Sequence, residues 1–178
     1  ILYGGPSGTF NRLETVFTLI ANATDEVASG DNNDALPADA TGDGHRDLIV
    51  ANVFEPVTSI QIYPNNPVGS FVGAATSITA IVGGGAGITP SDLALAQLNP
   101  LIDPFPDLAV AAFADPKFFI YLGDGRGNFS PFTQTSLTTN SFGQNLDVGD
   151  FNRDGYNDVA IADRLRVWVF FGDGGGRF

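Results

Sequence analysis

The feature that most constrains the fold of this chain is an aspartate-rich stretch of nine residues that occurs twice. The first copy runs from Asp39 to Asp47 and the second from Asp150 to Asp158. Each has oxygen-bearing side chains at positions one, three, five and nine, a glycine at position six, and a short apolar strand directly after it. Alternate residues of an extended turn point to one side, and glycine allows a sharp turn that a Cβ would obstruct. The spacing therefore predicts a site for a hard divalent cation.

Calcium is the cation that this pattern favours, because it takes about six to eight oxygen ligands at flexible distances. The seventh residue is expected to contribute its backbone carbonyl. An EF-hand differs, since its loop ends in a glutamate and lies between helices. A simple turn, whose aspartates bond backbone amides, is the alternative, and two copies that both extend to the ninth aspartate favour calcium over it. The two predicted ligand sets are Asp39, Thr41, Asp43, the His45 carbonyl and Asp47, and Asp150, Asn152, Asp154, the Tyr156 carbonyl and Asp158.

A third copy, from Gln97 to Asp107, repeats the plan in an altered form. It has two extra residues, a glutamine in place of the first aspartate and a proline in place of the glycine, so we expect this loop to be empty of calcium. The ninth-position aspartates Asp47, Asp107 and Asp158 are 60 and 51 residues apart. A period of this size indicates a repeat architecture.

A second motif, Gly-x-Phe, follows the same period and ends at Phe10, Phe71, Phe129 and Phe178. It comes after a short aromatic-rich strand and a glycine-rich turn such as Asp124-Gly125, of the kind that tight β-turns require. Each repeat thus has a strand before the metal loop, one after it, a third ending near this turn, and a fourth starting at the Gly-x-Phe. This is the strand count of one blade of a β-propeller.

Composition supports the same fold class. The chain has 22 glycines, 11 prolines and 15 phenylalanines in 178 residues, and it lacks a sustained helical period of apolar residues. We predict an all-β fold, a β-propeller segment built of four-stranded antiparallel blades, with about three blades in this chain. The chain is expected to be a single partial propeller, with the end of one blade in residues 1–34, blades over about 35–80 and 91–137, and an incomplete blade over 144–178.

Charge and composition also limit the partners. The net charge is −12, from 20 acidic and 8 basic residues, so a phosphate backbone would be repelled and no nucleic acid is expected as a partner. No apolar run approaches the roughly 20 residues that span a membrane. The chain has no cysteine, which excludes disulfides and thiolate metal sites. It begins at Ile1 within an expected strand and has no methionine, so we expect a preceding segment to have been removed.

The residues offer few candidates for catalysis. His45 is the sole histidine and lies at the seventh loop position, where the backbone carbonyl binds, so the usual catalytic triads cannot be assembled. Trp168 could stack on a sugar, but residues 167–170 are apolar on both faces, which favours packing between neighbouring sheets. Carboxylate pairs for glycoside hydrolysis remain an alternative, because 20 acidic residues offer many pairs. No catalytic residue is predicted, and the ligand-binding residues are unknown.

The run from Leu146 to Ala162, followed by Val169 to Phe178, resembles the FG-GAP/VCBS repeat, the unit of integrin-α-like β-propellers. Phe142-Gly143 matches the first half of the motif, whereas Ala162-Asp163 departs from the second, which points to the microbial secreted branch. The resemblance is strong in the third repeat, good in the first and weak in the second. It implies calcium at the two ligand sets above and a partner on the face opposite the metal loops. That face would be formed by residues 22–34, 52–59, 80–91, 113–117 and 162–166, with Glu55, Lys117, Arg164 and Arg166 as exposed candidates.

These expectations combine into one function. We expect a secreted or cell-surface, calcium-stabilised β-propeller that acts as a non-catalytic scaffold for a protein or carbohydrate ligand. A polysaccharide-active enzyme is one alternative, and a structural repeat protein that forms rings or filaments by strand pairing is another. Because propellers contain about four to eight blades, further blades from the same precursor or from other chains are expected to close the ring.

Overall fold

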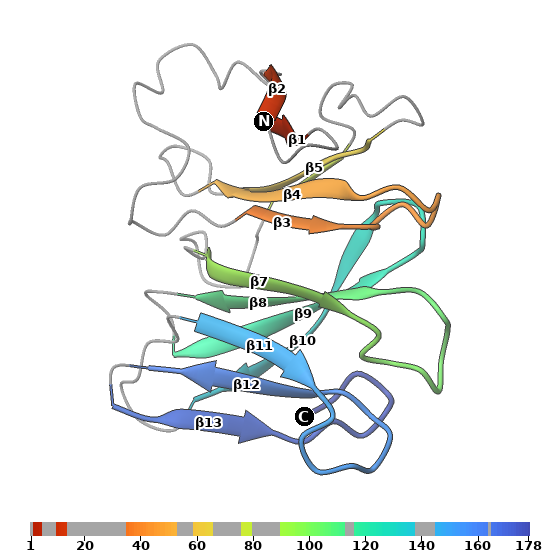
Figure 1. The fold of residues 1–178 in the computed structure, drawn as a ribbon. Coiled ribbons are helices and arrows are strands. Elements are labelled where there is room, and N and C mark those ends of the chain that lie inside the picture. Colours follow the sequence, from red (N-terminus) through yellow and green to blue (C-terminus); the bar gives the residue numbers. More distant parts are fainter. Residues whose placement is uncertain are drawn as a thin grey trace.

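The computed structural model describes residues 2–4, 10–13, 35–52, 59–65, 76–79, 90–112, 116–137, 145–163 and 165–178. These residues form antiparallel β-sheets, which confirms the predicted all-β class (Figure 1). Among them, no helix is long and apolar enough to cross a membrane.

Each larger sheet is a simple meander, in which strands that follow one another in the sequence are hydrogen-bonded neighbours. Only short turns are needed to connect such strands. The strands are β1 (Leu2–Gly4) and β2 (Phe10–Leu13) in a separate pair; β3 (Ala35–Ala38), β4 (Asp47–Asn52), β5 (Ser59–Tyr63) and β6 (Thr76–Thr79) in the first sheet; β7 (Pro90–Ala96), β8 (Asp107–Ala112), β9 (Lys117–Gly123) and β10 (Phe129–Ser136) in the second; and β11 (Asn145–Gly149), β12 (Asp158–Ala162) and β13 (Val167–Phe170) in the third.

The turn between β9 and β10 shows how the Gly-x-Phe motif acts. Gly125 and Gly127 have φ angles of 68° and 80°, a region that glycine enters without steric cost. The strand β10 then begins at Phe129, as the motif predicts. Gly174 and Gly176 repeat these angles, at 75° and 82°, in the turn that follows β13.

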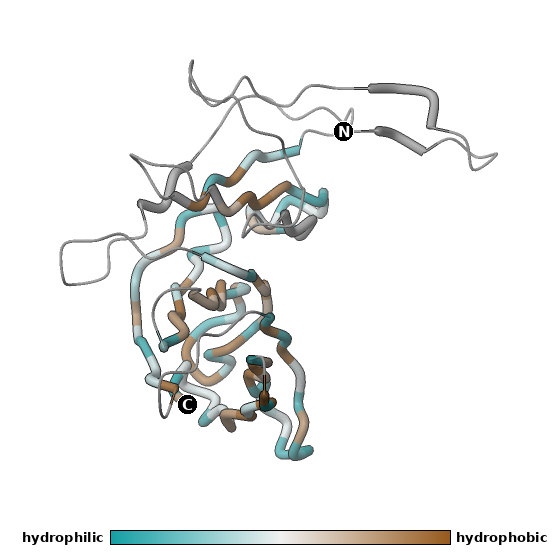
Figure 2. Tube along the Cα trace, turned by 90° about the vertical axis from the view of Figure 1, so that its left-hand side faces the viewer, coloured by the Kyte–Doolittle hydropathy of each residue, from teal (hydrophilic) through white to brown (hydrophobic). Residues whose placement is uncertain are grey.

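The three larger sheets lie one above another, with the second between the first and the third (Figure 1). Strand β7 contacts β3 and β4 on one side and β11 on the other. Apolar stretches of the chain run along the strands of the lower part of the molecule, and hydrophilic residues gather in several of the turns (Figure 2). One buried cluster joins the first and second sheets through residues such as Ile49, Ile62, Leu108 and Tyr121. Another joins the second and third through Phe118, Ile120, Val159 and Ile161.

The outward face of the third sheet differs from what the sequence predicts. Val167 and Val169 of β13 are 68% and 44% exposed, whereas Phe118 and Ile120, in the same register positions of β9, are 0% and 1% exposed. A strand covered on both faces was therefore the right prediction for β9 and the wrong one for β13. Strand β9 lies between two sheets, whereas no described residue covers the outward face of β13.

Candidate functional site

The ninth aspartate of all three loops is fully buried and begins a strand. One carboxylate oxygen accepts backbone N–H groups from the start of its own loop, and the other accepts an N–H at the end of the third strand of the same sheet or just after it. Asp47 accepts from Ala40 and Thr41 (both 2.9 Å) and from Asn65 (2.9 Å); Asp107 from Leu98 (3.0 Å) and Gly123 (3.1 Å); and Asp158 from Phe151 (2.9 Å), Asn152 (3.3 Å) and Gly172 (2.9 Å).

In the second and third sheets, the residue that donates from the end of the third strand is a glycine with little room for a side chain. A Cβ on Gly123 would lie 2.1 Å from the carbonyl oxygen of Pro106, and one on Gly172 would lie 2.2 Å from that of Asn157. The backbone of the metal loop therefore passes directly over these glycines. The sequence gives no signal for this contact beyond the glycines themselves, which also suit a turn.

The first aspartate organises the turn of each intact loop. Asp39 accepts the N–H groups of Gly42 (2.7 Å), Asp43 (3.2 Å) and Gly44 (3.0 Å). In the other intact loop, Asp150 accepts those of Asp154 (3.1 Å) and Gly155 (3.0 Å). Both turns therefore hold their shape through backbone amides that point at this carboxylate.

Both intact loops need left-handed backbone at positions four and six. At position six, Gly44 and Gly155 have φ angles of 84° and 91°, as the predicted sharp turn requires. At position four the first loop has Gly42 (φ 71°), but the other has Arg153 (φ 65°), which costs of order 1 kcal/mol of strain. The pattern of oxygen-bearing residues does not mark position four, because this position provides no ligand side chain.

Positions three and five differ between the two intact loops. Thr41 Oγ1 is buried and has no hydrogen-bond partner among the described residues. Its counterpart, Asn152, accepts the N–H of Asp154 (2.9 Å) and donates to Asp154 Oδ2 (2.9 Å). At position five, Asp43 and Asp154 each accept the N–H of the seventh residue at 2.8 Å. The first loop thus has a buried oxygen that its own contacts leave unsatisfied.

The side chains of the intact loops offer the oxygen ligands that a hard cation takes, but they are not gathered around a common centre. Within the segments that the structure describes, no three acidic, histidine or cysteine side chains gather in a cluster that could hold an ion. A carboxylate offers about four acceptor positions, and the described hydrogen bonds use three at Asp47 and Asp158 and two at Asp150. With the buried hydroxyl of Thr41, the donor set consists of oxygen alone, which suits calcium better than zinc or copper.

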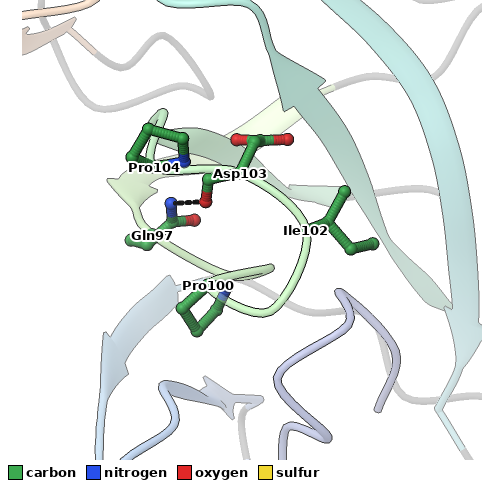
Figure 3. A pocket seen from close by; sticks show the side chains of 5 residues that line it. All are labelled: Gln97, Pro100, Ile102, Asp103 and Pro104. Atoms are coloured by element: carbon green, nitrogen blue, oxygen red, sulfur yellow. Dashed lines mark hydrogen bonds between the residues drawn. The ribbon is translucent and has the colours of Figure 1, made fainter.

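The altered loop is held together by side-chain amides. Gln97 Nε2 donates to the carbonyl oxygen of Asp103 (Figure 3). Gln97 Oε1 accepts the N–H of Asn99 at 3.2 Å. Asn99 Nδ2 donates to Asp103 Oδ2 at 3.0 Å, and Asp103 Oδ1 accepts the N–H of Phe105 at 2.9 Å. The last bond repeats the one between positions five and seven of the intact loops. N–H donors therefore bind the oxygens of Gln97 and Asp103 in this loop, whereas Asn99 Oδ1, like Thr41 Oγ1, is buried and has no partner among the described residues.

The altered loop also exposes apolar side chains. Leu101, Ile102 and Phe105 are 66%, 61% and 40% exposed. Sequence reasoning missed this surface because it treated the loop only as a metal site with substitutions, although the apolar residues between Asn99 and Asp103 were visible. An open cavity of about 540 Å³ lies beside them, lined by Gln97, Pro100, Ile102, Asp103 and Pro104 (Figure 3).

The predicted partner face is only partly described. Trp168 packs against the core between the second and third sheets, as predicted for packing between sheets. Its Nε1 donates to Asp163 Oδ2 at 3.2 Å, and the guanidinium of Arg166 lies 5.6 Å from its ring centroid. Lys117 begins β9 and is half-buried. The remaining candidates, Glu55, Arg164 and residues 22–34, 53–58, 80–89 and 113–115, lie outside the described residues.

Comparison with known proteins gives structural matches over most of the chain and a family match over residues 103–161. BBS1N, a β-propeller solved in complex with ARL6DN, matches with a TM-score of 0.52 and 17% identity over 77% of this chain and 35% of that chain. The Tc holotoxin pore of Photorhabdus luminescens matches with a TM-score of 0.55 and 15% identity over 82% of this chain and 6% of that chain. The present chain thus spans a minor part of either protein. A search of curated proteins gave no match. Residues 103–161, which run from within the altered loop into β12, match the family described as FG-GAP-like repeat.

Proposed function

We propose that the chain is a calcium-stabilised segment of an extracellular or cell-surface β-propeller and acts as a non-catalytic scaffold for a protein or carbohydrate ligand. The observation that carries this proposal is the common hydrogen-bond frame of the three loops. In each loop, the ninth carboxylate and the fifth residue bind equivalent backbone amides. The first position has a carboxylate in the two loops with calcium spacing, and the neutral amide of Gln97 in the altered loop. These hydrogen bonds hold the shape of all three loops. Calcium stabilises the two loops whose first residue is acidic.

The scaffold role follows from how the acidic groups are used. The described carboxylates in the loops accept backbone amides of their own turns, which leaves them poorly placed as a pair of glycosidase acids. The exposed Leu101 and Ile102 instead provide apolar contact area, which is typical of protein interaction sites. An extracellular setting fits, because sites with few carboxylates bind calcium in the high micromolar to millimolar range. Release of reducing sugar from a panel of polysaccharides would contradict the non-catalytic assignment.

Removal of calcium is expected to destabilise the chain. At a calcium concentration about 100 times the dissociation constant, one site stabilises the folded state by about 2.7 kcal/mol. For a chain of this size, that corresponds to a rise in melting temperature of roughly 5–10 °C. Differential scanning calorimetry in excess calcium and in excess chelator measures the difference.

A double variant provides the control for this measurement. Asp39→Ala with Asp150→Ala should melt at the same temperature with calcium and with chelator, because both intact loops lack their first ligand. Magnesium should stabilise the wild type less, since it requires a near-octahedral site. Equal melting of the wild type with calcium and chelator, and no heat of binding on titration with calcium, would contradict the calcium assignment.

A second role, in assembly, is favoured by the outward face of the third sheet. Val167 and Val169 lie exposed at register positions whose counterparts in the second sheet are the buried Phe118 and Ile120, and Phe171, directly after β13, is also exposed. In the two joints within this chain, such a face is covered by the sheet of the next repeat. We propose the same kind of occupant here, either from a second copy or from the remainder of the same protein.

Sedimentation velocity tests this assembly role. A second copy as occupant predicts concentration-dependent association that Val169→Lys abolishes. An occupant from elsewhere in the protein predicts a monomer that binds the hydrophobic dye ANS, with binding reduced by the same substitution. A monomer that does not bind the dye would contradict an uncovered apolar face.

A further inference from the structure

The first calcium loop contacts a hairpin of the following sheet. This hairpin, residues 124–128, joins β9 to β10. Gly127 donates its N–H to the carbonyl oxygen of Ala40 at 3.1 Å. A Cβ on Gly127 would lie 3.2 Å from the methyl of Thr41, and one on Gly42 would lie 3.0 Å from the carbonyl oxygen of Gly125. Positions two, three and four of the loop therefore lie against a hairpin that is distant in the sequence.

The joint between the second and third sheets has the same design. Leu101 of the altered loop donates its N–H to the carbonyl oxygen of Gly174, in the hairpin after β13, at 3.0 Å. Asn157 Nδ2 donates to the carbonyl oxygen of Gln97 at 2.9 Å, in the opposite direction along the stack. Each of these two loops thus contacts the hairpin of the next sheet. For the third loop, residues 150–158, the described part of the chain contains no next sheet.

The third loop contacts the hairpin of its own sheet instead. A Cβ on Gly174 would lie 2.6 Å from the ring of Tyr156, the seventh residue of that loop. Phe105 contacts Gly125 in the same way within the second sheet, at 2.3 Å from the constructed Cβ. The hairpin 124–128 therefore contacts the altered loop of its own sheet and the first calcium loop of the preceding one, and the described contacts give it none with the third loop.

From these contacts, and resting on the calcium function proposed above, we infer that the hairpin 124–128 positions the first calcium loop and sets its calcium affinity. Thr41 joins the two, because its buried hydroxyl is a predicted ligand and its methyl lies against Gly127. An ordered hairpin restricts the loop to the conformation that binds the ion, which raises affinity. By linkage, the ion stabilises the joint between the first and second sheets by the same factor. The third loop is independent of this hairpin.

Asp124 offers a way to loosen the hairpin without disturbing the core. Its exposed carboxylate accepts the N–H of Arg126 (2.8 Å), the N–H of Asn128 (3.2 Å) and Asn128 Nδ2 (2.8 Å). The Asn128 side chain is the main reason that the pKa of Asp124 is lowered. Asp173 does the same in the third sheet, accepting the N–H groups of Gly175 (2.7 Å) and Arg177 (3.1 Å).

The test compares Asp124→Ala with Asp173→Ala in the full chain by calorimetric titration with calcium chloride. The first loop is measured alone in an Asp150→Ala background, and the third loop alone in an Asp39→Ala background. Asp124→Ala should weaken binding at the first loop about fivefold, the equivalent of about one hydrogen bond, and leave the third within about twofold. Asp173→Ala should weaken the third loop and leave the first unchanged.

Thr41→Ser provides a second test that does not depend on the hairpin remaining folded. It keeps the hydroxyl and removes the methyl that lies against Gly127, so it should weaken the first loop about two- to threefold. Unchanged affinity of the first loop in both Asp124→Ala and Thr41→Ser would overturn the inference while the calcium function stands. Equal losses at both loops in Asp124→Ala would overturn it as well, by showing a general loss of structure. Absence of calcium binding in the wild type would overturn both proposals.

Discussion

Replacement of Asp107 by alanine is expected to lower the free energy of unfolding by about 3 kcal/mol, a large part of the total stability of a domain. The carboxylate is fully buried and accepts two buried hydrogen bonds, from the N–H groups of Leu98 (3.0 Å) and Gly123 (3.1 Å). Alanine would leave both donors without a partner and open a cavity. Burial raises the pKa of Asp107, and the hydrogen bonds from these two amides act in the opposite direction.

Urea denaturation in the presence of chelator measures this effect, because Asp107 lies in the loop without calcium spacing and its contribution does not depend on metal. The control is Asp147→Ala, since Asp147 is exposed and accepts one exposed bond, from Val148 at 2.8 Å. The control should change stability by no more than about 0.5 kcal/mol. A similar small change for Asp107→Ala would contradict the role of the ninth aspartate in joining loop to sheet.

Replacement of Phe118 by alanine is expected to cost about 4 kcal/mol, the range for a fully buried aromatic side chain. Phe118 is 0% exposed and lies at the joint between the second and third sheets. Its ring centroid is 5.0 Å from that of Phe170 in β13 and 5.7 Å from that of Phe178. The substitution removes contacts with both rings, so the joint as well as the second sheet is weakened.

Phe171→Ala is the matched control, because Phe171 is the same residue type at 58% exposure. Chemical denaturation should show a loss of about 0.5 kcal/mol or less for the control. Differential scanning calorimetry of Phe118→Ala provides a second readout. If the unfolding heat of the third sheet is lost while the second sheet still unfolds cooperatively, the substitution has weakened the joint between them. Equal effects of the two substitutions would show that Phe171 is buried in solution, as it would be in the assembly proposed for the outward face of the third sheet.

The strands and turns could be predicted from the sequence because their causes are local. The glycines at 125 and 127 permit positive φ angles, and the apolar run that follows Asp47, Asp107 or Asp158 forms a strand wherever it occurs. The repeat period then gives the order of the strands in each sheet. The calcium ligand sets are also local patterns, and they remain proposals, supported by the oxygen donors that the loops present.

The second role of the ninth aspartate could not be predicted in this way. Its partner from the third strand lies 18 residues away for Asp47, 16 for Asp107 and 14 for Asp158. That partner is a backbone N–H, so neither the spacing nor the residue type marks it. The contacts of the first loop with residues 124–128 are hidden for the same reason, since they join two repeats through glycine backbone.

From its residues alone, the chain has repeated loops, antiparallel strands and apolar third strands, because turn chemistry and side-chain polarity act over a few neighbours. Residues 118–121 and 167–170 are both apolar, and the sequence treats them alike. The packing of the sheets makes their burial differ, because the third sheet buries Phe118 whereas Val167 is exposed to solvent. Burial depends on which sheet lies opposite, and only the packing of whole repeats provides that information.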